Sequence, residues 1–454
     1  MVFFKWSSHV YTVRQIIIKK TNADIYNYCQ RRAELAYRLY NAALFRIRQI
    51  FTGFNRESLN DNQKQVFAEI KALSKARPDL TVKQFIGYRQ LEKMMRITGN
   101  PDFFAGLPAQ TSQAMVRHAR QDFNNWLSAL KDFKKNPSKY LGKPKMPHYK
   151  KVPCCFTITN QDAVIFYRDK LKLPGTKFRV HISDVSGSGP LKEVKVIPYY
   201  GRFILSLTFK SADQPLLSSG KQAAGIDFGI DNFAAIVATD GSSRLYKGGA
   251  VLSENRMFAK KRAKAVSLIT RGRNHVHASS RYLQNLSYHH ANFNRDQLHK
   301  ISRSIVGFCI KHEVGTLVLG ENKLWKQESN MGKINNQKFV QMPIGLLKQM
   351  IEYKAAQAGI RIISQEESYT SKASFLDNDR VPVYGKNDAK ALFSGKRISR
   401  GLYRSKDGTV INADLNGAAN ILKKAITGVW EKSGLTDFKF LNTPEVYGFH
   451  KLNP

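Results

Sequence analysis

Three short acidic segments, far apart in the chain, constrain its fold more than any other feature of the sequence. Each places one carboxylate at the edge of an apolar run, and the three carboxylates are Asp227, Glu321 and Asp414. Asp227 and Glu321 follow runs typical of buried strands, whereas Asp414 stands at the start of a predicted helix. Carboxylates gathered where strands end can hold Mg²⁺, which prefers hard oxygen ligands. The predicted site therefore requires two strand ends and one helix start to meet.

The balance of charge indicates a polyanionic partner. The 454 residues include 73 Lys and Arg but only 34 Asp and Glu, which gives a formal charge of +39. Self-repulsion of this size destabilises a compact state unless a polyanion offsets it. Nucleic acid is the partner that we expect, with a long footprint, and a membrane surface is the weaker alternative. Beside nucleic acid, a site of Mg²⁺-binding carboxylates suits the hydrolysis of phosphodiesters.

Cysteine content and the N-terminal residues bear on the compartment. The four cysteines, in so long a chain, favour a reducing cytosol without a disulfide framework. The first six residues are too few and too polar to suggest a signal peptide, and no run of 18 or more apolar residues predicts a membrane span. We therefore expect a cytoplasmic protein without a membrane partner.

The first part of the chain changes from a strand to a helical block. Residues 10–19 are β-branched and short, which predicts a strand. Apolar residues three or four apart then predict a helix that begins after Thr21-Asn22 and is broken at Thr52-Gly53. Further helices are expected at 61–74, at 81–97 with Thr81 as N-cap, and at 110–133 after Pro108.

A basic stretch at residues 131–151 follows the helical block. It holds eight lysines, one Asp and three prolines, and the prolines exclude a regular helix. With aromatic residues between the lysines, we interpret it as a strip that contacts a nucleic-acid backbone; a solvated tether is the alternative. The lysines expected to bind are Lys134, Lys135, Lys143, Lys145, Lys150 and Lys151.

The pattern then becomes one of short strands and, later, of alternating strands and helices. Residues 154–210 predict a small β-barrel, which the strand at 10–19 joins, so that the helices are an insertion within it. From residue 223, a hairpin meander followed by alternating helices and strands predicts an RNase H-like sheet. Residues 255–282 are basic and contain no acid. The residues there that are expected to bind nucleic acid are Lys260, Lys261, Arg262, Arg271 and Arg273.

Several residues near these features have more than one interpretation. Taken singly, the three carboxylates are ordinary turn, surface and N-cap residues, and their combination favours an active site. Asp231 is expected near the site without being a ligand. Trp325 and Tyr369 could stack on bases or pack in the core. Four histidines are expected to contact phosphate or solvent in preference to a metal, and they are His275, His277, His289 and His290.

The order Asp, Glu, Asp in these contexts resembles the three motifs of a RuvC-type nuclease domain. The fuller resemblance is to the TnpB family, RNA-guided nucleases of insertion sequences that are related to type V CRISPR effectors. It rests on GIDFGIDNFAAI at 225–236, LVLGENKLWKQ at 317–327, ESYTSKASF at 367–375 and INADLNGAANILKKA at 411–425. Residues 107–127 and 143–150 resemble the family's second recognition helix and basic linker.

The resemblance implies a multidomain α+β protein. Its expected parts are a β-barrel wedge domain (1–21 and 137–211), an inserted helical recognition domain (22–136), a linker (212–222), a RuvC-like α/β nuclease domain (223–370 and 411–425) and a tail (426–454). A guide RNA and a double-stranded DNA target beside a short flanking motif would be the partners. Asp227, Glu321 and Asp414 would be catalytic and would hold two Mg²⁺ ions. A bacterial or archaeal cytoplasm, close to the nucleoid, would be the location.

One departure from the family concerns zinc. The family usually has a four-cysteine zinc ribbon between its second and third acidic motifs. The corresponding places here hold Ser374, Asp377, Ser405 and Gly408, and no cysteine follows Cys309. We therefore expect residues 371–410 to fold without zinc, as a basic loop that touches the target nucleic acid through Lys396 and Arg397.

Three alternatives remain beside a transposon-encoded guided nuclease. A guide-RNA-dependent DNA-binding regulator with little cleavage would be expected to have lost an acidic residue, and all three are present. An Asp-Asp-Glu transposase would end its acidic set in Glu, whereas this chain ends in Asp414. A compact type V CRISPR effector is not distinguished by one chain, because only genomic context separates it.

Overall fold

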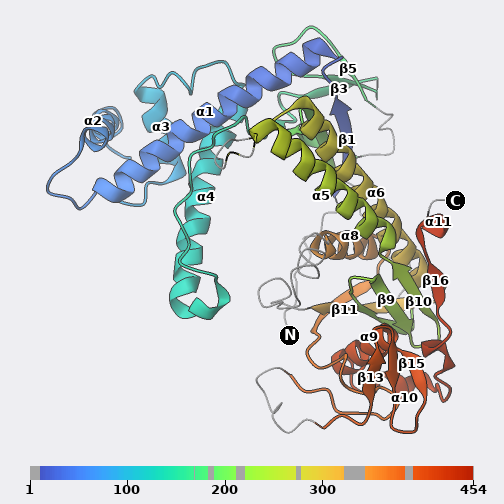
Figure 1. Cartoon of the computed structure of the whole chain (residues 1–454). Coiled ribbons are helices and arrows are strands. Elements are labelled where there is room, and N and C mark those ends of the chain that lie inside the picture. Colours follow the sequence, from blue (N-terminus) through green and yellow to red (C-terminus); the bar gives the residue numbers. More distant parts are fainter. Residues whose placement is uncertain are drawn as a thin grey trace. The chain divides into compact units, whose positions relative to one another are not determined.

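The computed structural model describes residues 11–167, 169–182, 189–210, 220–271, 273, 278–321, 343–383 and 392–452. The chain divides into two compact units, residues 1–213 and 214–454 (Figure 1). Among the residues described, no helix combines the length and the apolar character that crossing a membrane requires.

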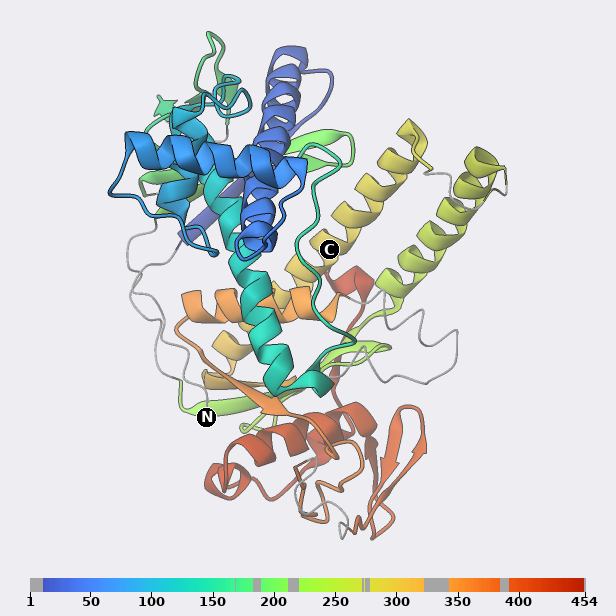
Figure 2. The same ribbon diagram turned by 90° about the vertical axis from the view of Figure 1, so that its left-hand side faces the viewer.

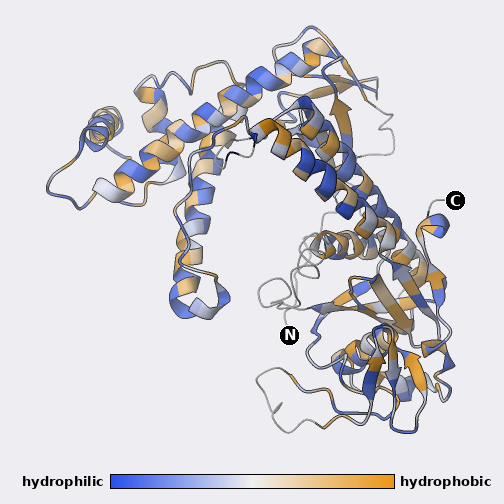
Figure 3. Ribbon diagram, viewed as in Figure 1, coloured by the Kyte–Doolittle hydropathy of each residue, from blue (hydrophilic) through white to orange (hydrophobic). Residues whose placement is uncertain are grey.

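The helices of the first unit largely follow the predicted pattern. They are α1 (Ala23–Gly53), α2 (Asp61–Ala76), α3 (Tyr88–Ile97) and α4 (Ala109–Lys135). Helix α1 shows hydrophilic and hydrophobic colours in alternation along its length, as expected of a helix with one buried face (Figure 3). Its buried face includes Cys29, Ala33, Ala36 and Ile47, which confirms the spacing that predicted the helix.

The predicted helix start at Thr81 is wrong. Helix α3 begins at Tyr88 after Gly87, and residues 81–87 have no helical structure. Val82 and Ile86 are both buried in this segment. The Ile86 carbonyl accepts a hydrogen bond from Arg120 Nε, whereas a helix would direct that carbonyl to an amide four residues later. Tertiary contacts therefore take precedence over the local capping signal.

The strands of the first unit form two sheets. Strands β1 (Tyr11–Ile18), β7 (Arg202–Lys210), β6 (Leu191–Tyr199) and β2 (Phe156–Thr159) form an antiparallel sheet in that order. Strand β1 pairs with β7 along its whole length, which confirms that the N-terminal strand joins the later ones. The helices α1–α4 therefore lie, in sequence, between two strands of one sheet.

A closed barrel is not present among the described strands. Strands β3 (Val164–Phe166), β4 (Lys170–Lys172) and β5 (Val180–His181) form a separate three-stranded sheet, and β1 and β2 lie at the edges of the larger one. Where the sequence predicted one barrel, the structure therefore has two small antiparallel sheets. Strand β4 is the middle strand of this second sheet and pairs with both β3 and β5.

The second unit is built on a six-stranded sheet with the order β12-β11-β8-β9-β10-β16. Strands β8, β9 and β10 form an antiparallel meander, and β11 and β12 continue the sheet in parallel with β8. The strands are β8 (Gln222–Asp227), β9 (Asn232–Ala238), β10 (Ser243–Lys247), β11 (Val314–Glu321), β12 (Arg361–Glu366) and β16 (Glu445–Tyr447).

Helices cover both faces of this sheet. On one face, Ala224 and Ile226 belong to a core with α6 (Arg281–Lys311) and α8 (Ile344–Gln357). On the other, Ala223 and Val318 belong to a core with α9 (Ala413–Ala425). Figure 1 shows α8 and α9 on opposite sides of the strands. Alternate residues of β8 thus face two different cores, as expected of a fully covered strand.

Helix α5 (Gly249–Thr270) packs beside α6, and the pair projects from the sheet (Figures 1 and 2). Only Val251 and Asn255 are buried among the described side chains of α5. The C-terminal segment, for which the sequence predicted no structure, includes α10 (Val429–Ser433), a 3₁₀ turn at Lys439–Leu441, strand β16 and α11 (Phe449–Leu452). Strand β16 lies on the sheet edge, where Glu445 forms a 2.6 Å ion pair with the buried Arg244.

The described residues of the region 371–410 include regular strands, where the sequence predicted a loop. Strands β13 (Lys396–Ser399), β14 (Leu402–Arg404) and β15 (Val410–Asn412) form an antiparallel sheet. Asp379 accepts hydrogen bonds from the backbone amides of Ser374 and Ser394, at 2.7 and 3.0 Å, and from the Ser394 hydroxyl. Asp377 accepts one from the Lys406 amide at 2.9 Å. Carboxylates thus join the segments where the resemblance would place zinc-binding cysteines.

We expect Asp379→Ala to destabilise this region by about 2–4 kcal/mol, because it removes the charged acceptor of three donors. Hydrogen exchange of residues 373–379 and 392–412 measures the effect. Asp437→Asn is the matched control, since Asp437 is exposed and bonds only within its own turn. Unchanged exchange in Asp379→Ala would show that these hydrogen bonds do not hold the region.

Candidate active site

Asp227 occupies the C-terminal end of the central strand β8. Its side chain is half-buried, and burial raises the pKa of its carboxyl well above the usual range. The neighbouring carboxylates of Glu367 and Asp414 raise the pKa further, while Arg397 opposes them. The sequence prediction that Asp227 and Asp414 converge is therefore consistent with the structure, and Glu367 is an additional neighbour.

Asp414 lies in the first turn of α9. The Asn412 side chain caps this helix by accepting hydrogen bonds from the amides of Asp414 and Leu415. One carboxylate oxygen of Asp414 accepts a 2.6 Å hydrogen bond from Asn232 Nδ2, and the other lies 3.3 Å from Arg397 Nη2. Asn232, at the start of β9, and Arg397, on β13, therefore fix the position of Asp414.

Close contact between helix and strand brings Asp414 towards Asp227. A Cβ atom added at Gly225 in β8 would lie 2.5 Å from the Ala418 carbonyl oxygen of α9. One added at Gly417, one turn after Asp414, would lie 2.6 Å from Asp227 Oδ2. Glycine at both positions leaves room for the helix start beside the strand end.

Carboxylates also stand where the neighbouring parallel strands end: Glu321 at the end of β11, and Glu367 directly after β12. Glu321 is the last residue of β11 and is in register with Glu366 on β12. The backbone amide of Glu367, the next residue, donates to the Glu321 carbonyl at 3.3 Å. A Cβ at Gly320 would lie 2.9 Å from Glu367 Oε2, which places this carboxylate against the end of β11.

Glu367 was not among the site residues that the sequence predicted. Its signal was present, because it follows a predicted strand, as Asp227 and Glu321 do. The carboxyl ends of adjacent parallel strands share one edge of a sheet, so a carboxylate after β12 reaches the same place.

Helix α8 contributes a half-buried cation to this edge. Lys348 Nζ donates a hydrogen bond to the Gly320 carbonyl and lies 4.8 Å from the centre of the Phe228 ring. Burial lowers the pKa of Lys348, and the carboxylates of Glu367, Glu321 and Asp227 oppose that change. The sequence showed no sign of this role, because a lysine in an amphipathic helix usually faces solvent.

The donor set fits a hard divalent cation. It consists of carboxylate oxygens without sulfur, and a bound cation would offset the repulsion that raises the pKa of Asp227. Within the part of the chain described, however, no three Asp, Glu, His or Cys side chains form a group that could hold one metal ion. The chemistry of these side chains therefore fits a divalent cation. Both carboxylate oxygens of Asp414, however, accept hydrogen bonds from Asn232 and Arg397.

The basic residues predicted to bind nucleic acid are mostly exposed. On the first unit, all six except Lys150 are exposed, and Lys150 Nζ lies 4.1 Å from the centre of the Tyr40 ring. The five predicted on α5 and just after it are exposed, as is Lys396 on β13. Arg397 is half-exposed and pairs with Asp414. The structure therefore gives Lys150 a packing contact and Arg397 a partner in the site.

The remaining candidates have separate surroundings. Asp231 forms a 2.6 Å ion pair with Arg400. His290 stacks on Phe258 with 3.9 Å between ring centres and hydrogen-bonds Asn255. The ring of Tyr369 stacks on that of Phe393 with 6.2 Å between ring centres, and the φ of Tyr369 is positive. Trp325, His275 and His277 lie outside the described residues.

Comparisons with known proteins agree with the predicted family. Residues 206–326 match the family OrfB_IS605, described as a probable transposase, and residues 345–421 match the Cas12f1-like TNB domain. The TnpB-like protein ORF457 of Acidianus two-tailed virus is 32% identical over 213 residues, which are 46% of this chain and 42% of that protein. The CRISPR-associated endodeoxyribonuclease Cas12f1 of Sulfoacidibacillus thermotolerans is 26% identical over 231 residues, which are 48% of this chain and 50% of that protein.

A solved structure has a similar fold over most of the chain. The cryo-EM structure of a Cas12f1-sgRNA-target DNA complex contains a chain that matches with a TM-score of 0.50 and 13% identity, covering 91% of this chain and 99% of that one. This similarity supports a multidomain α+β fold. The matches to the curated relatives span half the length of those proteins or less. Two family models and two curated relatives, one of them TnpB-like, thus each match a part of this chain and support its resemblance to the TnpB family.

Proposed function

We propose that the chain is an RNA-guided DNA endonuclease with a single RuvC-like site. The observation that carries this proposal is the position of half-buried Asp227 at the end of β8, where the carboxylates of Glu367 and Asp414 raise its pKa in addition to burial. A half-buried carboxylate beside other carboxylates is costly unless it serves a cation, so the arrangement favours catalysis over structure. The strand order β10-β9-β8-β11-β12, a meander followed by two parallel strands, supports an RNase H-like domain.

The residues proposed to hold two Mg²⁺ ions are Asp227, Glu321 and Asp414, with Glu367 beside them. The ions would supply an activated water and a stabilised leaving oxygen at the phosphodiester. Lys348 lies beside these carboxylates, which oppose the lowering of its pKa by burial. For Asp414 to become a ligand, Arg397 must release the oxygen that it now contacts. Because Arg397 is half-exposed, we propose that it then pairs with a phosphate of the substrate.

The remaining parts would hold the guide RNA and its pairing with the target. We propose that the first unit contains the wedge and recognition domains, that it reads a short motif beside the target, and that exposed lysines neutralise phosphates. A charge of +39 is consistent with binding a guide RNA together with a heteroduplex. A cytoplasmic location near the nucleoid would follow from this function.

A guide-RNA-dependent regulator with little cleavage is the second candidate. The observation that favours it is the contact of Arg397 and Asn232 with both oxygens of Asp414. A site held permanently in that state would bind DNA without cutting it. An Asp-Asp-Glu transposase remains the weaker candidate, since the last acidic residue of the set is Asp414.

The decisive experiment begins with the RNA that co-purifies with the full chain. Sequencing is expected to show one discrete species with a variable end. The complex is then offered a plasmid library in which a matching target is flanked by random bases, with Mg²⁺ or with EDTA. Mg²⁺-dependent cutting of a subset of flanks supports the proposal. Target binding without cutting would favour the regulator, and cutting independent of the RNA would contradict guided action.

A further inference from the structure

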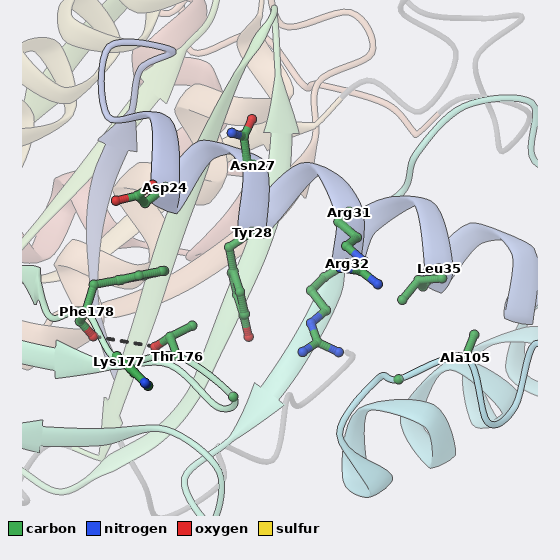
Figure 4. A pocket seen from close by; sticks show the side chains of 12 residues that line it. Asp24, Asn27, Tyr28, Arg31, Arg32, Leu35, Ala105, Thr176, Lys177 and Phe178 are labelled. Atoms are coloured by element: carbon green, nitrogen blue, oxygen red, sulfur yellow. Dashed lines mark hydrogen bonds between the residues drawn. The ribbon is translucent and has the colours of Figure 1, made fainter.

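A pocket of about 600 Å³ lies in the first unit. Its lining comes from the first turns of α1, from the loop at Ala105-Gly106 and from the turn at 175–178 between β4 and β5 (Figure 4). Pockets of 300–1,000 Å³ are of the size that binds small organic ligands. Every lining residue belongs to the described part of this one unit.

The pocket joins an aromatic wall to a set of cations. Tyr28 and Phe178 meet edge to face, with 6.2 Å between ring centres. The Arg32 guanidinium lies 5.4 Å from the centre of the Tyr28 ring, and Figure 4 shows both side chains pointing from α1 towards the turn. Arg31 and Lys177 line the same pocket. None of these three cations is paired with a carboxylate among the residues that the structure describes.

The backbone on both sides leaves room at the Arg32 guanidinium. A Cβ at Gly175, where φ is +69°, would lie 3.2 Å from Arg32 Nη2, and one at Gly106 would lie 3.9 Å from Arg32 Nη1. The Tyr28 hydroxyl is buried and makes no hydrogen bond within the described structure. Asp24 and Asn27 add an acceptor and an amide to the lining. The pocket therefore offers ring faces, anion-binding cations and polar groups to one ligand.

We propose that this pocket binds one unstacked nucleotide of the bound nucleic acid. The aromatic wall suits a base that has left its stack, and the three cations suit the adjoining phosphates. Asp24 and Asn27 suit the hydrogen-bonding edge of the base or the sugar hydroxyls. The nucleotide comes either from the guide RNA or from the DNA beside the target. The inference rests on the proposed nucleic-acid function.

Mononucleotide binding tests the pocket without requiring guided cleavage. The full chain, freed of RNA, is titrated with the four ribonucleoside and four deoxyribonucleoside monophosphates, and saturation-transfer NMR records contact with the base protons. We expect Arg32→Gln and Phe178→Leu each to weaken the best nucleotide about tenfold. Arg38→Gln is the matched control, because Arg38 is an exposed arginine of the same helix outside the pocket.

The outcomes separate a nucleotide pocket from general attraction of anions. Equal affinity of Arg32→Gln and Arg38→Gln, with circular dichroism unchanged, would overturn the proposal. The proposal would also be overturned if Phe178→Leu lost the same affinity for inorganic phosphate as for nucleotides, because a phosphate does not contact an aromatic wall. This experiment is independent of cutting, so a catalytically inactive protein that still binds the nucleotide refutes only the proposed function.

Cross-linking then identifies the source of the nucleotide. Complexes of the full chain are assembled with photoreactive base analogues placed, one position at a time, in the RNA or in the DNA. A cross-link to Tyr28 or Phe178 from one strand assigns the nucleotide to that strand. Cross-links to other residues only, from both strands, would contradict the proposal.

Discussion

Asp227→Asn is expected to lower the rate of DNA cleavage at least about a thousandfold while leaving RNA and target binding unchanged. Asp227 is the half-buried carboxylate at the centre of the proposed metal site, whereas phosphate contacts are expected from exposed lysines. The measurement is single-turnover cleavage of a labelled target by the purified complex, with target affinity determined in parallel. Asp437→Asn, at an exposed turn, is the control.

The same substitution is expected to stabilise the metal-free fold. A carboxyl whose pKa is raised by folding binds its proton more tightly in the folded state, so stability falls as the pH rises from the unfolded pKa towards the folded one. Asparagine has no charge to bury. In EDTA at neutral pH, Asp227→Asn should therefore raise the free energy of unfolding of the second unit by about 1–2 kcal/mol.

This stabilisation should depend on both pH and metal. Below the unfolded pKa of the carboxyl, near 4, the two proteins should differ little, because Asp227 is then protonated in both states. Added Mg²⁺ should stabilise the wild-type protein more than the variant. Cleavage at the wild-type rate, or a variant less stable in EDTA at neutral pH, would contradict the role assigned to Asp227.

Gly225→Ala is expected to destabilise the second unit by about 2–4 kcal/mol and to reduce cleavage with it. The added methyl group would lie 2.5 Å from the Ala418 carbonyl oxygen and 2.8 Å from Leu422 Cβ. Strand β8 and helix α9 must then separate, and α9 positions Asp414. Chemical denaturation followed by far-UV circular dichroism measures the stability, and the same cleavage assay measures the effect on the site.

Gly307→Ala is the matched control for this prediction. Gly307 lies in α6 of the same unit, and an added Cβ there meets no atom within 4 Å. Alanine favours the helix over glycine by about 0.5–1 kcal/mol, so this variant should be slightly more stable than the wild type. Equal stability of Gly225→Ala and the wild type would mean that α9 does not pack directly on β8.

Regular patterns in the sequence predicted most elements of the fold. The spacing of apolar residues predicted α1, a β-branched run predicted β1, an apolar run predicted β11, and a helix start was expected at Asp414, in the first turn of α9. The N-terminal strand was also expected to join the strands after the helical block, and the structure pairs it with β7. These predictions succeed because periodicity and burial are linked within each element.

Predictions failed where contacts between elements decide the conformation. Thr81 has the side chain of an N-cap, yet buried Val82 and Ile86 hold residues 81–87 outside a helix. The short strands β3–β5 form their own sheet instead of closing a barrel. The absence of cysteines after Cys309 excluded a four-cysteine zinc site there. It did not predict that Asp377 and Asp379 would join the same segments through hydrogen bonds.

The sequence by itself determined the candidate carboxylates Asp227, Glu321 and Asp414, because each stands at a boundary that apolar patterning marks. It also determined the strong positive charge and the lack of zinc-ligating cysteines. Only the tertiary structure placed Glu367, Lys348 and Arg397 beside those carboxylates. Strand order, helix packing and backbone contact bring these residues together, and such distances between elements leave no periodic signal along the chain.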